Sequence, residues 1–265
     1  MENMIPNVLS IAGSDPSGGA GIQADLKTFA ALGCYGMATI TSLTAQNTAG
    51  VRAVIDVPDR FVKDQISAIF DDIEVAAVKI GMLSSADIIN AVADCLEEYK
   101  PANIVLDPVM VASSGDSLIT SDAIIAMKER LIPLCHVLTP NIPEAEKLSR
   151  KSVIDMERSV RGLLELGCGA VLLKGGHLKG AVARDVLAYD DITKIYEAPR
   201  IDTVNTHGTG CTLSSAIAAY LALGESLPDS CRLAKEYLNG ALKHADKLNV
   251  GSGHGPVHHG FKGGR

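Results

Sequence analysis

The 265-residue sequence has few of the features on which several large classes of protein depend. It contains no tryptophan, and aromatic residues make up only 4% of the chain, so stacking surfaces for nucleic-acid bases are scarce. Acidic residues (31) outnumber lysine and arginine (24), and no basic cluster stands out. A protein that binds nucleic acid usually carries such a cluster, so the composition indicates a small-molecule partner and no nucleic acid.

Paired cysteines, membrane spans and export signals are also missing. The six cysteines are scattered without a Cys-x-x-Cys pair, which is typical of reduced thiols in a cytoplasmic protein. No apolar run reaches the ~18 residues of a membrane-spanning helix. No basic residue precedes Lys27, so the N-terminal segment does not resemble a secretory signal. We therefore expect a cytoplasmic protein that does not bind a membrane.

Short β-branched runs alternate with segments of helical spacing along the chain. The runs are residues 7–13, 76–83, 102–110, 136–141 and 168–176. In the helical segment after residue 83, Ser84 or Ser85 is a suitable N-cap. Continuous apolar strands that alternate with helices predict right-handed βαβ units. The fold class is thus α/β, a doubly wound, mostly parallel sheet flanked by helices.

Two further segments have the pattern of antiparallel pairs. Residues 36–57 read as strand, polar turn and strand, and we expect a small β flap at a sheet edge over the site. Residues 185–202 read as a late hairpin. Without a linker or repeat, one domain over residues 1–265 is expected. The glycine-rich segment 251–265 is expected to be loosely held.

Polar or glycine-rich residues follow each predicted strand. These stretches are GSDPSGGAG, KIGM, DPVM, TPNIPE and KGGH. Ligands of doubly wound sheets bind beyond the carboxyl ends of the strands, so a composite site is expected there. The first stretch matches neither of the common nucleotide-binding glycine patterns, and by itself fits a tight strand-to-helix connection equally well.

Three charged residues follow neighbouring strands. Asp107 comes just after a buried run, and Asn141 with Glu144 forms an N-x-x-E pattern at a helix start. Two such carboxylates can share a hydrated Mg²⁺ with phosphate oxygens, although Glu144 alone is more typical of an ordinary helix start. Lys174 ends a strand, and the glycines behind it leave room for a phosphate chain.

The segment NTHGTGCTLS (205–214) places a cysteine at the start of an apolar helix. It fits a tight turn into a core helix. It equally fits an anion site formed by the backbone N–H groups of Gly208, Thr209, Gly210 and Cys211, where a thiol would have a lowered pKa. With the acidic pair and Lys174, the anion site favours phosphoryl transfer. Acyl transfer by Cys211 with His207 is an alternative.

These motifs in this order resemble the bacterial hydroxymethylpyrimidine/phosphomethylpyrimidine kinases of thiamin biosynthesis, which have the ribokinase-like fold. The resemblance rests on AGSDPSGGAGIQADLKT, AQNT, KIGML, LDPVM, TPNIPEA, KGGH, NTHGTGCTLS and GPVHH, and it spans nearly the whole chain. It implies ATP-dependent phosphorylation of 4-amino-5-hydroxymethyl-2-methylpyrimidine and then of its monophosphate. Many ribokinase-like relatives have Asp where this chain has Cys211, and the cysteine resembles the pyrimidine and pyridoxal branch.

The resemblance also implies a role for each matching residue. Gln46 would bind the aminopyrimidine edge, because one amide supplies a donor and an acceptor. Cys211 would accept the hydroxymethyl proton. The other implied roles are pocket lining for Gly13, Asp25, Met82 and Val109, Mg²⁺ binding for Asp107 and Glu144, ATP binding for Asn141, Lys174 and Thr206, and stabilisation of the transferring phosphoryl group by Gly208, Thr209, Gly210 and Lys174.

Two rival functions follow from the same residues. A pyridoxal kinase of the same branch is the nearer, but Gln46 suits an aminopyrimidine better than the phenolic oxygen and aldehyde of pyridoxal. A non-catalytic ligand-sensing domain is the other, and it would be expected to lose Asp107, Glu144 or Cys211, all of which are present. The expected partners are the pyrimidine, ATP with Mg²⁺, and a second copy of the chain in a homodimer.

Overall fold

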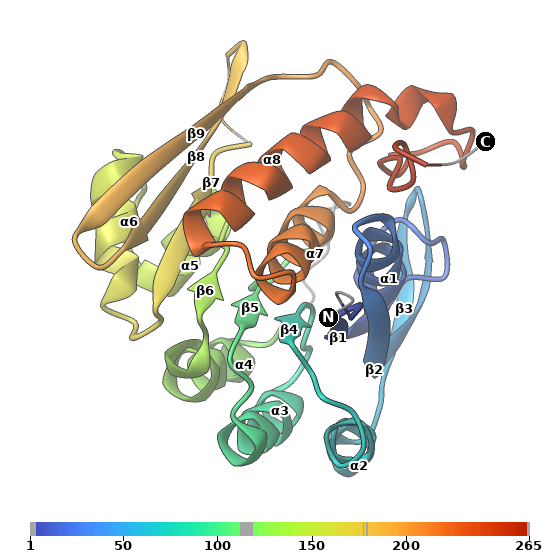
Figure 1. The fold of residues 1–265 in the computed structure, drawn as a ribbon, viewed down its shortest axis with the longest axis vertical. Coiled ribbons are helices and arrows are strands. Elements are labelled where there is room, and N and C mark those ends of the chain that lie inside the picture. The colour runs from blue at the N-terminus through green and yellow to red at the C-terminus, as the bar shows by residue number, and fades with distance from the viewer. Residues whose placement is uncertain (1–3, 112–118, 177, 179, 264–265) are drawn as a thin grey trace.

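The computed structural model describes residues 4–111, 119–176, 178 and 180–263, and within them nine strands form one mixed sheet (Figure 1). In order across the sheet, the strands are β3 (Gly50–Asp56), β2 (Tyr35–Asn47), β1 (Asn7–Ser14), β4 (Ala77–Ile80), β5 (Ile104–Leu106), β6 (Val137–Leu138), β7 (Ala170–Lys174), β8 (Val182–Tyr189) and β9 (Ile192–Pro199). The six from β2 to β7 are parallel, whereas β3, and at the other edge β8 and β9, pair antiparallel. The predicted α/β class and both predicted hairpins are confirmed.

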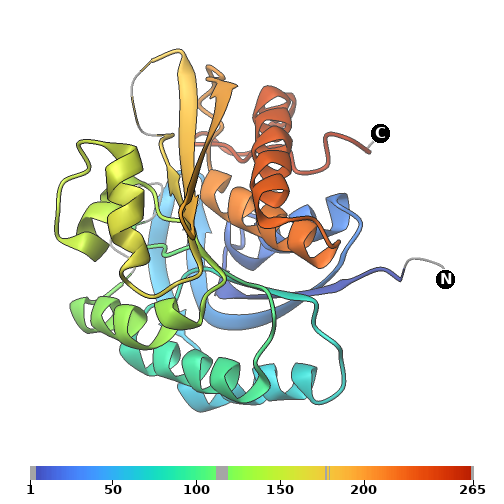
Figure 2. The same ribbon diagram turned by 60° about the vertical axis from the view of Figure 1, so that its left-hand side comes forward.

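Helices cover both faces of the sheet (Figures 1 and 2). One face carries α1 (Gly21–Ala31), α7 (Thr209–Ala222) and α8 (Leu227–Lys243), followed by the 3₁₀ turn η3 (Ala245–Lys247). The other carries α2 (Asp59–Phe70), α3 (Ala86–Tyr99), α4 (Ser121–Ala126) with its continuations η1 (Met127–Leu131) and η2 (Ile132–Leu134), α5 (Ile142–Ser149) and α6 (Met156–Leu164). None of these described helices is long and apolar enough to cross a membrane.

The two helical layers enclose two hydrophobic cores, and successive strand residues contribute to opposite cores. On β1, Val8 packs toward α1 and α7, while Leu9 packs toward α2 and α3. Val105 and Leu106 on β5 divide in the same way. Each side chain of this size contributes about 1.5–3 kcal/mol on full burial. The central strands are therefore continuous apolar runs, as parallel strands buried on both faces require.

Local capping residues set several helix boundaries. Ser85 is the N-cap of α3, and its side chain accepts a hydrogen bond from the Ile88 N–H at 3.4 Å. Ser84, the alternative, instead donates to Asp56 Oδ1 at 2.6 Å. The chain thereby joins the start of α3 to the end of β3.

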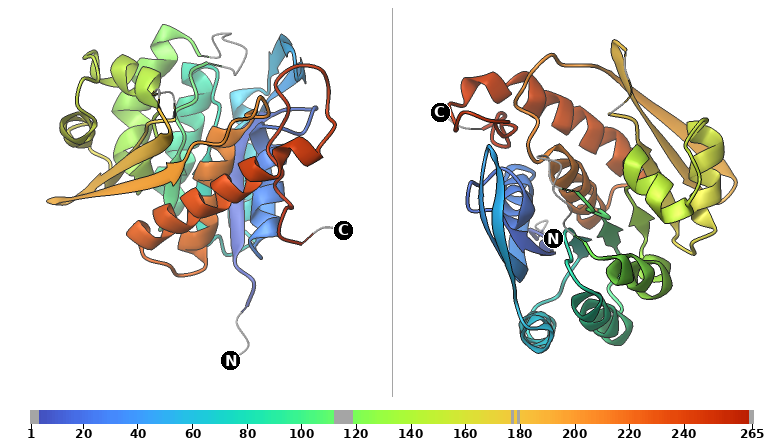
Figure 3. Two further views of the ribbon diagram at one scale, coloured as in Figure 1. Left: turned by 90° about the horizontal axis from the view of Figure 1, so that it is seen from above. Right: turned by 180° about the vertical axis from the view of Figure 1, so that it is seen from behind.

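The prediction that the glycine-rich segment 251–265 is loosely held is wrong for residues 254–259. Gly255, Pro256 and Val257 are buried, and the His207 N–H donates to Gly255 O at 3.0 Å. The His254 N–H donates to Thr48 O at 3.0 Å. The C-terminal segment therefore lies beside the β2–β3 hairpin, which is far from it in the sequence (Figure 3). Glycines here permit close backbone approach rather than mobility.

The order of the strands determines where a ligand can bind. The chain moves from β1 to β2 on one side and then crosses to β4 on the other. The loops that leave β1 and β4 consequently separate, which opens a crevice at the carboxyl ends of these strands.

Candidate active site

A cavity of about 380 Å³ lies at this crevice. The loops after β1, β4, β5 and β6, the ends of β2 and β7, and the starts of α5 and α7 contribute to its walls. The residues that line it are Gly13, Ser14, Asp15, Ala20, Gly21, Thr44, Gln46, Lys79, Met82, Asp107, Val109, Met110, Val111, Asn141, Pro143, Glu144, Lys147, Lys174, His207, Gly208, Thr209, Gly210 and Cys211.

The cavity brings together most of the residues that the sequence singled out. Of the fourteen residues to which the resemblance gives a role, only Asp25 and Thr206 are not among its lining residues. The twelve that line it are Gly13, Gln46, Met82, Asp107, Val109, Asn141, Glu144, Lys174, Gly208, Thr209, Gly210 and Cys211. Residues from six strand ends and two helix starts, those of α5 and α7, thus share one space.

Asp25 lies beneath the cavity rather than in its wall. Its carboxylate is fully buried and accepts hydrogen bonds from Lys79 Nζ at 2.8 and 2.9 Å, Ser10 Oγ at 2.6 Å and Ser215 Oγ at 2.7 Å. Burial lowers the pKa of Lys79, but Asp25, Cys211 and Asp107 together outweigh this and the net shift is upward. The expected role of Asp25 in lining the pocket is therefore not confirmed. Asp25 instead forms an ion pair with Lys79, which does line the cavity.

Thr206 lies outside the cavity wall. It is exposed, and its N–H donates to Val204 O at 3.1 Å. The chain turns inward only at His207, which is buried. His177, in the KGGH motif, lies outside the described residues.

Asp107, Lys174 and Glu144 form a compact charged group. Lys174 Nζ lies 2.7 Å from Asp107 Oδ1 and 4.0 Å from Glu144 Oε2. Burial raises the pKa of Glu144 to about 7; Lys174 opposes this rise, and Asp107 adds to it. The single positive charge of Lys174 cannot offset two carboxylates, so the group can accept a further positive charge.

Asn141 and Glu144 are connected by the local structure of α5. Asn141 Oδ1 accepts from the Glu144 N–H at 2.9 Å, and Glu144 Oε2 accepts from the Asn141 N–H at 2.8 Å. This reciprocal pair is a capping box, so the N-x-x-E pattern does mark a helix start. The same box directs both side chains to the cavity.

The start of α7 depends on two glycines. Gly208 has φ +80°, and a Cβ there would collide with Gly19 O. A Cβ at Gly210 would lie 3.2 Å from Asp107 Oδ2 and 3.4 Å from Lys174 Nζ, so this turn adjoins the charged group. The Thr209 N–H is bound to Thr206 O at 3.3 Å. The N–H groups of the first turn that find no acceptor within the helix are available to an anion.

The thiol of Cys211 does not have the lowered pKa expected at a helix start. All six cysteines lie in described parts of the chain, and Cys211 alone is partly exposed. Burial raises its pKa to about 11, and Asp25 and Asp107 add to this while Lys79 opposes it. Desolvation and the two carboxylates outweigh Lys79 and the Gly21 N–H, so the thiol is neutral at pH 7. An acyl-transfer thiolate is not supported, and His207 bonds Asp15 instead.

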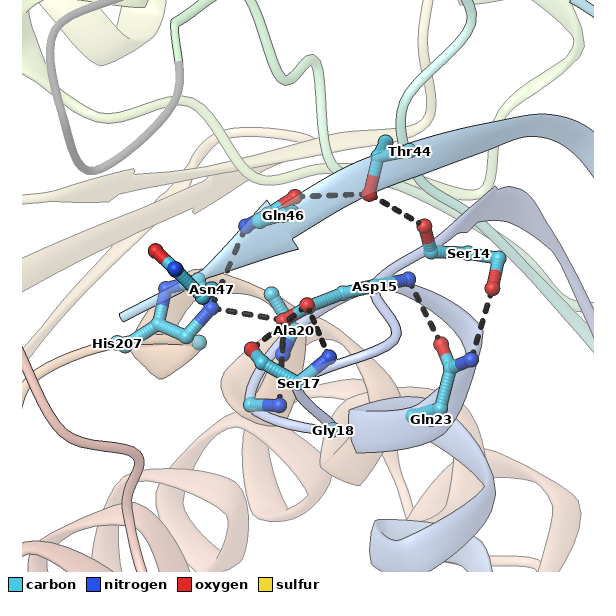
Figure 4. Close-up of polar contacts among 12 residues, drawn as sticks. Ser14, Asp15, Ser17, Gly18, Ala20, Gln23, Thr44, Gln46, Asn47 and His207 are labelled. Carbon is cyan, nitrogen blue, oxygen red and sulfur yellow. Dashed lines mark hydrogen bonds and ion pairs between the residues drawn. The ribbon is translucent and has the colours of Figure 1, made fainter. Parts of the chain in front are cut away.

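Sequence reasoning missed a polar network among other residues that line the cavity (Figure 4). Asp15 Oδ2 lies 2.8 Å from His207 Nε2, and Gln46 Nε2 lies 3.5 Å from the same nitrogen. Thr44 Oγ1 lies 3.2 Å from Gln46 Oε1. The available signal was Asp15 in a Ser-Asp-Pro-Ser turn, where a carboxylate commonly accepts N–H groups of its own loop. Nothing local links it to a histidine 192 residues away.

Within the described residues, no group of three or more His, Cys, Asp or Glu side chains could hold a metal ion. Asp107 and Glu144 supply two carboxylates. Mg²⁺ commonly takes one or two carboxylates and completes its shell with water and phosphate oxygens. The donor set therefore fits Mg²⁺ that arrives with a phosphate compound, but not a metal held by protein alone.

Comparisons with known proteins agree with this geometry. Residues 15–258 match the family model described as phosphomethylpyrimidine kinase. The hydroxymethylpyrimidine/phosphomethylpyrimidine kinase of Escherichia coli K12 is 49% identical over 96% of this chain and 97% of its own. The phosphomethylpyrimidine kinase structure from Clostridium difficile 630 is 48% identical, with TM-score 0.80, over 89% of this chain and 99% of that one. The Bacillus subtilis pyridoxal kinase in an ADP complex is 37% identical, with TM-score 0.90, over 98% and 99%. This chain belongs to the phosphomethylpyrimidine kinase family.

Proposed function

We propose that the protein transfers the γ-phosphoryl group of ATP to the hydroxymethyl group of 4-amino-5-hydroxymethyl-2-methylpyrimidine, and then phosphorylates the monophosphate to the diphosphate. The observation that carries this proposal is the convergence, within one cavity, of the start of α7, the Asp107–Lys174–Glu144 group and Gln46. Phosphoryl transfer needs charge stabilisation on one side and a positioned acceptor on the other.

Different lining residues bind the two substrates. Lys174 and the amide side chain of Asn141 bind ATP phosphates, and Gln46 pairs with the aminopyrimidine edge. Met82 and Val109 cover the ring faces, since both are apolar and line the cavity. The pyrimidine is thereby held with its hydroxymethyl group toward Cys211.

The start of α7 stabilises charge as the transfer proceeds. The hydroxymethyl oxygen forms a bond to the γ-phosphorus, the bond from that phosphorus to the β,γ-bridging oxygen breaks, and ADP leaves with the electron pair. The N–H groups at Gly208, Gly210 and Cys211 bind the transferring oxygens, because they lie at the positive end of the helix. Mg²⁺, held by Asp107 and Glu144, supplies further charge neutralisation when bound.

Cys211 accepts the hydroxyl proton as a thiolate. Since its pKa is about 11, the thiolate is the minor species at pH 7. The positive charge of Lys79 stabilises the thiolate, and the ion pair with Asp25 keeps Lys79 in place. A loose transition state asks for little early deprotonation, so a scarce base is compatible with turnover.

Pyridoxal phosphorylation is the second candidate, because the pyridoxal kinase of Bacillus subtilis superimposes with a TM-score of 0.90. A coupled assay of ADP release with the pyrimidine, its monophosphate and pyridoxal, side by side, separates the candidates. We expect the highest kcat/KM with the pyrimidine compounds. Preference for pyridoxal would assign the chain to the second activity, and no ADP release with any acceptor would leave a ligand-sensing protein.

A further inference from the structure

A second cavity, separate from the active site, lies between α1 and the C-terminal segment (Figure 1). Its volume is about 740 Å³, and among the described residues it shares no lining residue with the active-site cavity. The segment 248–263 contributes one side, and α1 with the loop before it contributes Ser17, Lys27, Ala30 and Ala31. We call this space the C-terminal cavity. Its volume is within the range of sites for small organic ligands.

The C-terminal cavity is lined by positive charge, although the chain as a whole has a net charge of -7. Lys27, Lys262, His258 and His259 line it, and no Asp or Glu does so in the part of the chain that the structure describes. Lys27 and Lys262 are also absent from all ion pairs between described residues. Their charges are therefore not offset by a neighbouring carboxylate.

Neutral groups hold both ammonium groups in place. Lys27 Nζ donates a hydrogen bond to Gly18 O at 2.8 Å. Lys262 Nζ lies 5.9 Å from the ring centroids of both Tyr237 and Phe261. A carbonyl oxygen and an aromatic face attract an ammonium group through their dipole and quadrupole, but neither carries a net charge. Each lysine consequently retains its full charge for a ligand.

The histidine at the wall of the cavity provides independent evidence of this positive environment. His259 is buried, and its Nε2 lies 3.0 Å from Thr212 Oγ1. Burial, and after it the charges of Lys27, His258 and His207, lower the pKa of His259 to about 4. The ring is thus neutral at pH 7. An anion bound beside Lys27 would offset the charge of that lysine and raise the pKa of His259.

Most of the remaining lining is apolar, and it consists of Ala30, Ala31, Leu248, Val250, Pro256 and Val257. We propose that the C-terminal cavity binds a small organic phosphate monoester, with its phosphate at Lys27 and Lys262 and its organic part against these apolar side chains. A monoester has a charge of about -1.5 to -2 at pH 7, which matches the two lysines. This assignment does not depend on the proposed function.

The test measures the binding of phenyl phosphate to the full chain by NMR, with the ring signals of His259 as the readout. These signals, assigned by their loss in His259→Gln, report on the C-terminal cavity, so a phosphate bound in the active site does not interfere. Lys27→Gln combined with Lys262→Gln should raise the Kd at least about tenfold, since both charged partners are lost. Lys243→Gln is the matched control, because Lys243 is exposed at the end of α8 and outside the cavity. It should leave the Kd within about twofold of the parent value.

Two further ligands test the chemical class. Phenyl phosphate should bind at least about tenfold more tightly than inorganic phosphate, because only the ester buries apolar surface. It should also bind more tightly than benzoate, which has a single charge. The pKa of His259 should be higher in the phenyl phosphate complex than in the free protein.

Each contrary result identifies what is wrong. His259 signals that millimolar phenyl phosphate does not move, or a Kd that is equal in the parent and the double variant, overturn the proposal. Equal affinity for inorganic phosphate would leave an ion site without an organic ligand, and equal affinity for benzoate would overturn the assignment to a phosphate. If the double variant does not fold by its thermal melt, the two single variants carry the test. Because binding is the readout, none of these results bears on the proposed kinase activity.

Discussion

At the scale of single residues, burial decides what charge a side chain can hold. Burial lowers the pKa of Lys79, but its ion pair with Asp25 at 2.8 Å contributes to a net upward shift, so the buried ammonium remains charged. Desolvation raises the pKa of Cys211 to about 11, and Lys79 only partly offsets this rise. Position at a helix start does not by itself activate a thiol. Desolvation has to be overcome first.

Removal of the Cys211 side chain should lower the rate without removing the anion site. The N–H groups at the start of α7 belong to the backbone, so Cys211→Ala should bind Mg-ATP nearly as the parent does. Its kcat should fall by about 10², the lower end for a positioned base. In the parent, kcat should rise as pH increases from 7 toward 10, because the thiolate fraction grows below a pKa of about 11.

The measurement is kcat against pH for the parent, Cys211→Ala and Cys211→Asp, with ATP affinity beside it. The Asp variant should retain more activity than Ala, and neither should show the thiol-dependent rise. Turnover of the Ala variant at the parent rate would place the base elsewhere.

At the scale of elements, packing positions α7, and the turn at Gly208 determines where the helix begins. Its buried residues surround the helix, among them Leu213, Ala216 and Ile217. A helix that is apolar all round is held by its neighbours on every side. Its first residue is consequently determined by the turn at Gly208, whose φ of +80° brings it against the loop at Gly19.

Gly208→Ala and Gly224→Ala together separate backbone strain from steric collision. Both glycines have positive φ, one just before α7 and one after it, but a Cβ at Gly224 meets nothing within 4 Å. Gly224→Ala should cost about 1–2 kcal/mol of unfolding free energy through strain and leave activity intact. Gly208→Ala adds a collision with backbone and should cost about 1–3 kcal/mol more. Urea denaturation and kcat measure both, and equal losses in the two variants would contradict this account.

At the scale of the whole molecule, the cavity exists because separate segments meet. Asp107 follows β5, Glu144 begins α5 and Lys174 ends β7, yet their charged atoms lie within 4.0 Å of Lys174 Nζ. The parallel arrangement of β5, β6 and β7 brings these ends to one edge. The resulting group has two carboxylates and one ammonium, so it favours an added cation.

Activity should disappear with EDTA and return with Mg²⁺. Asp107→Asn removes one negative charge from the group, so the Mg²⁺ concentration for half-maximal rate should rise by roughly tenfold, the factor that 1.4 kcal/mol represents. Asp72→Asn, an exposed carboxylate after α2, is the matched control and should leave the titration unchanged. An identical Mg²⁺ titration in Asp107→Asn and the parent would count against this placement.

The sequence by itself determined the features that depend on neighbours along the chain. The apolar strands, the capping box at Asn141 and Glu144, and the turn at Gly208 all follow from residues within a few positions. The motifs after each strand also indicated one composite site, because parallel strands end at one edge of a sheet. Twelve of the fourteen residues to which the family resemblance gives a role line the cavity.

Only the tertiary structure decided which distant groups touch. Asp15 and His207 are 192 residues apart, and Lys79 is 54 residues from Asp25, so no local pattern relates them. The same holds for the pKa of Cys211, which depends on desolvation and on carboxylates from other elements. Backbone preferences act over a few residues, whereas burial and ion pairing depend on which surfaces the complete fold brings into contact.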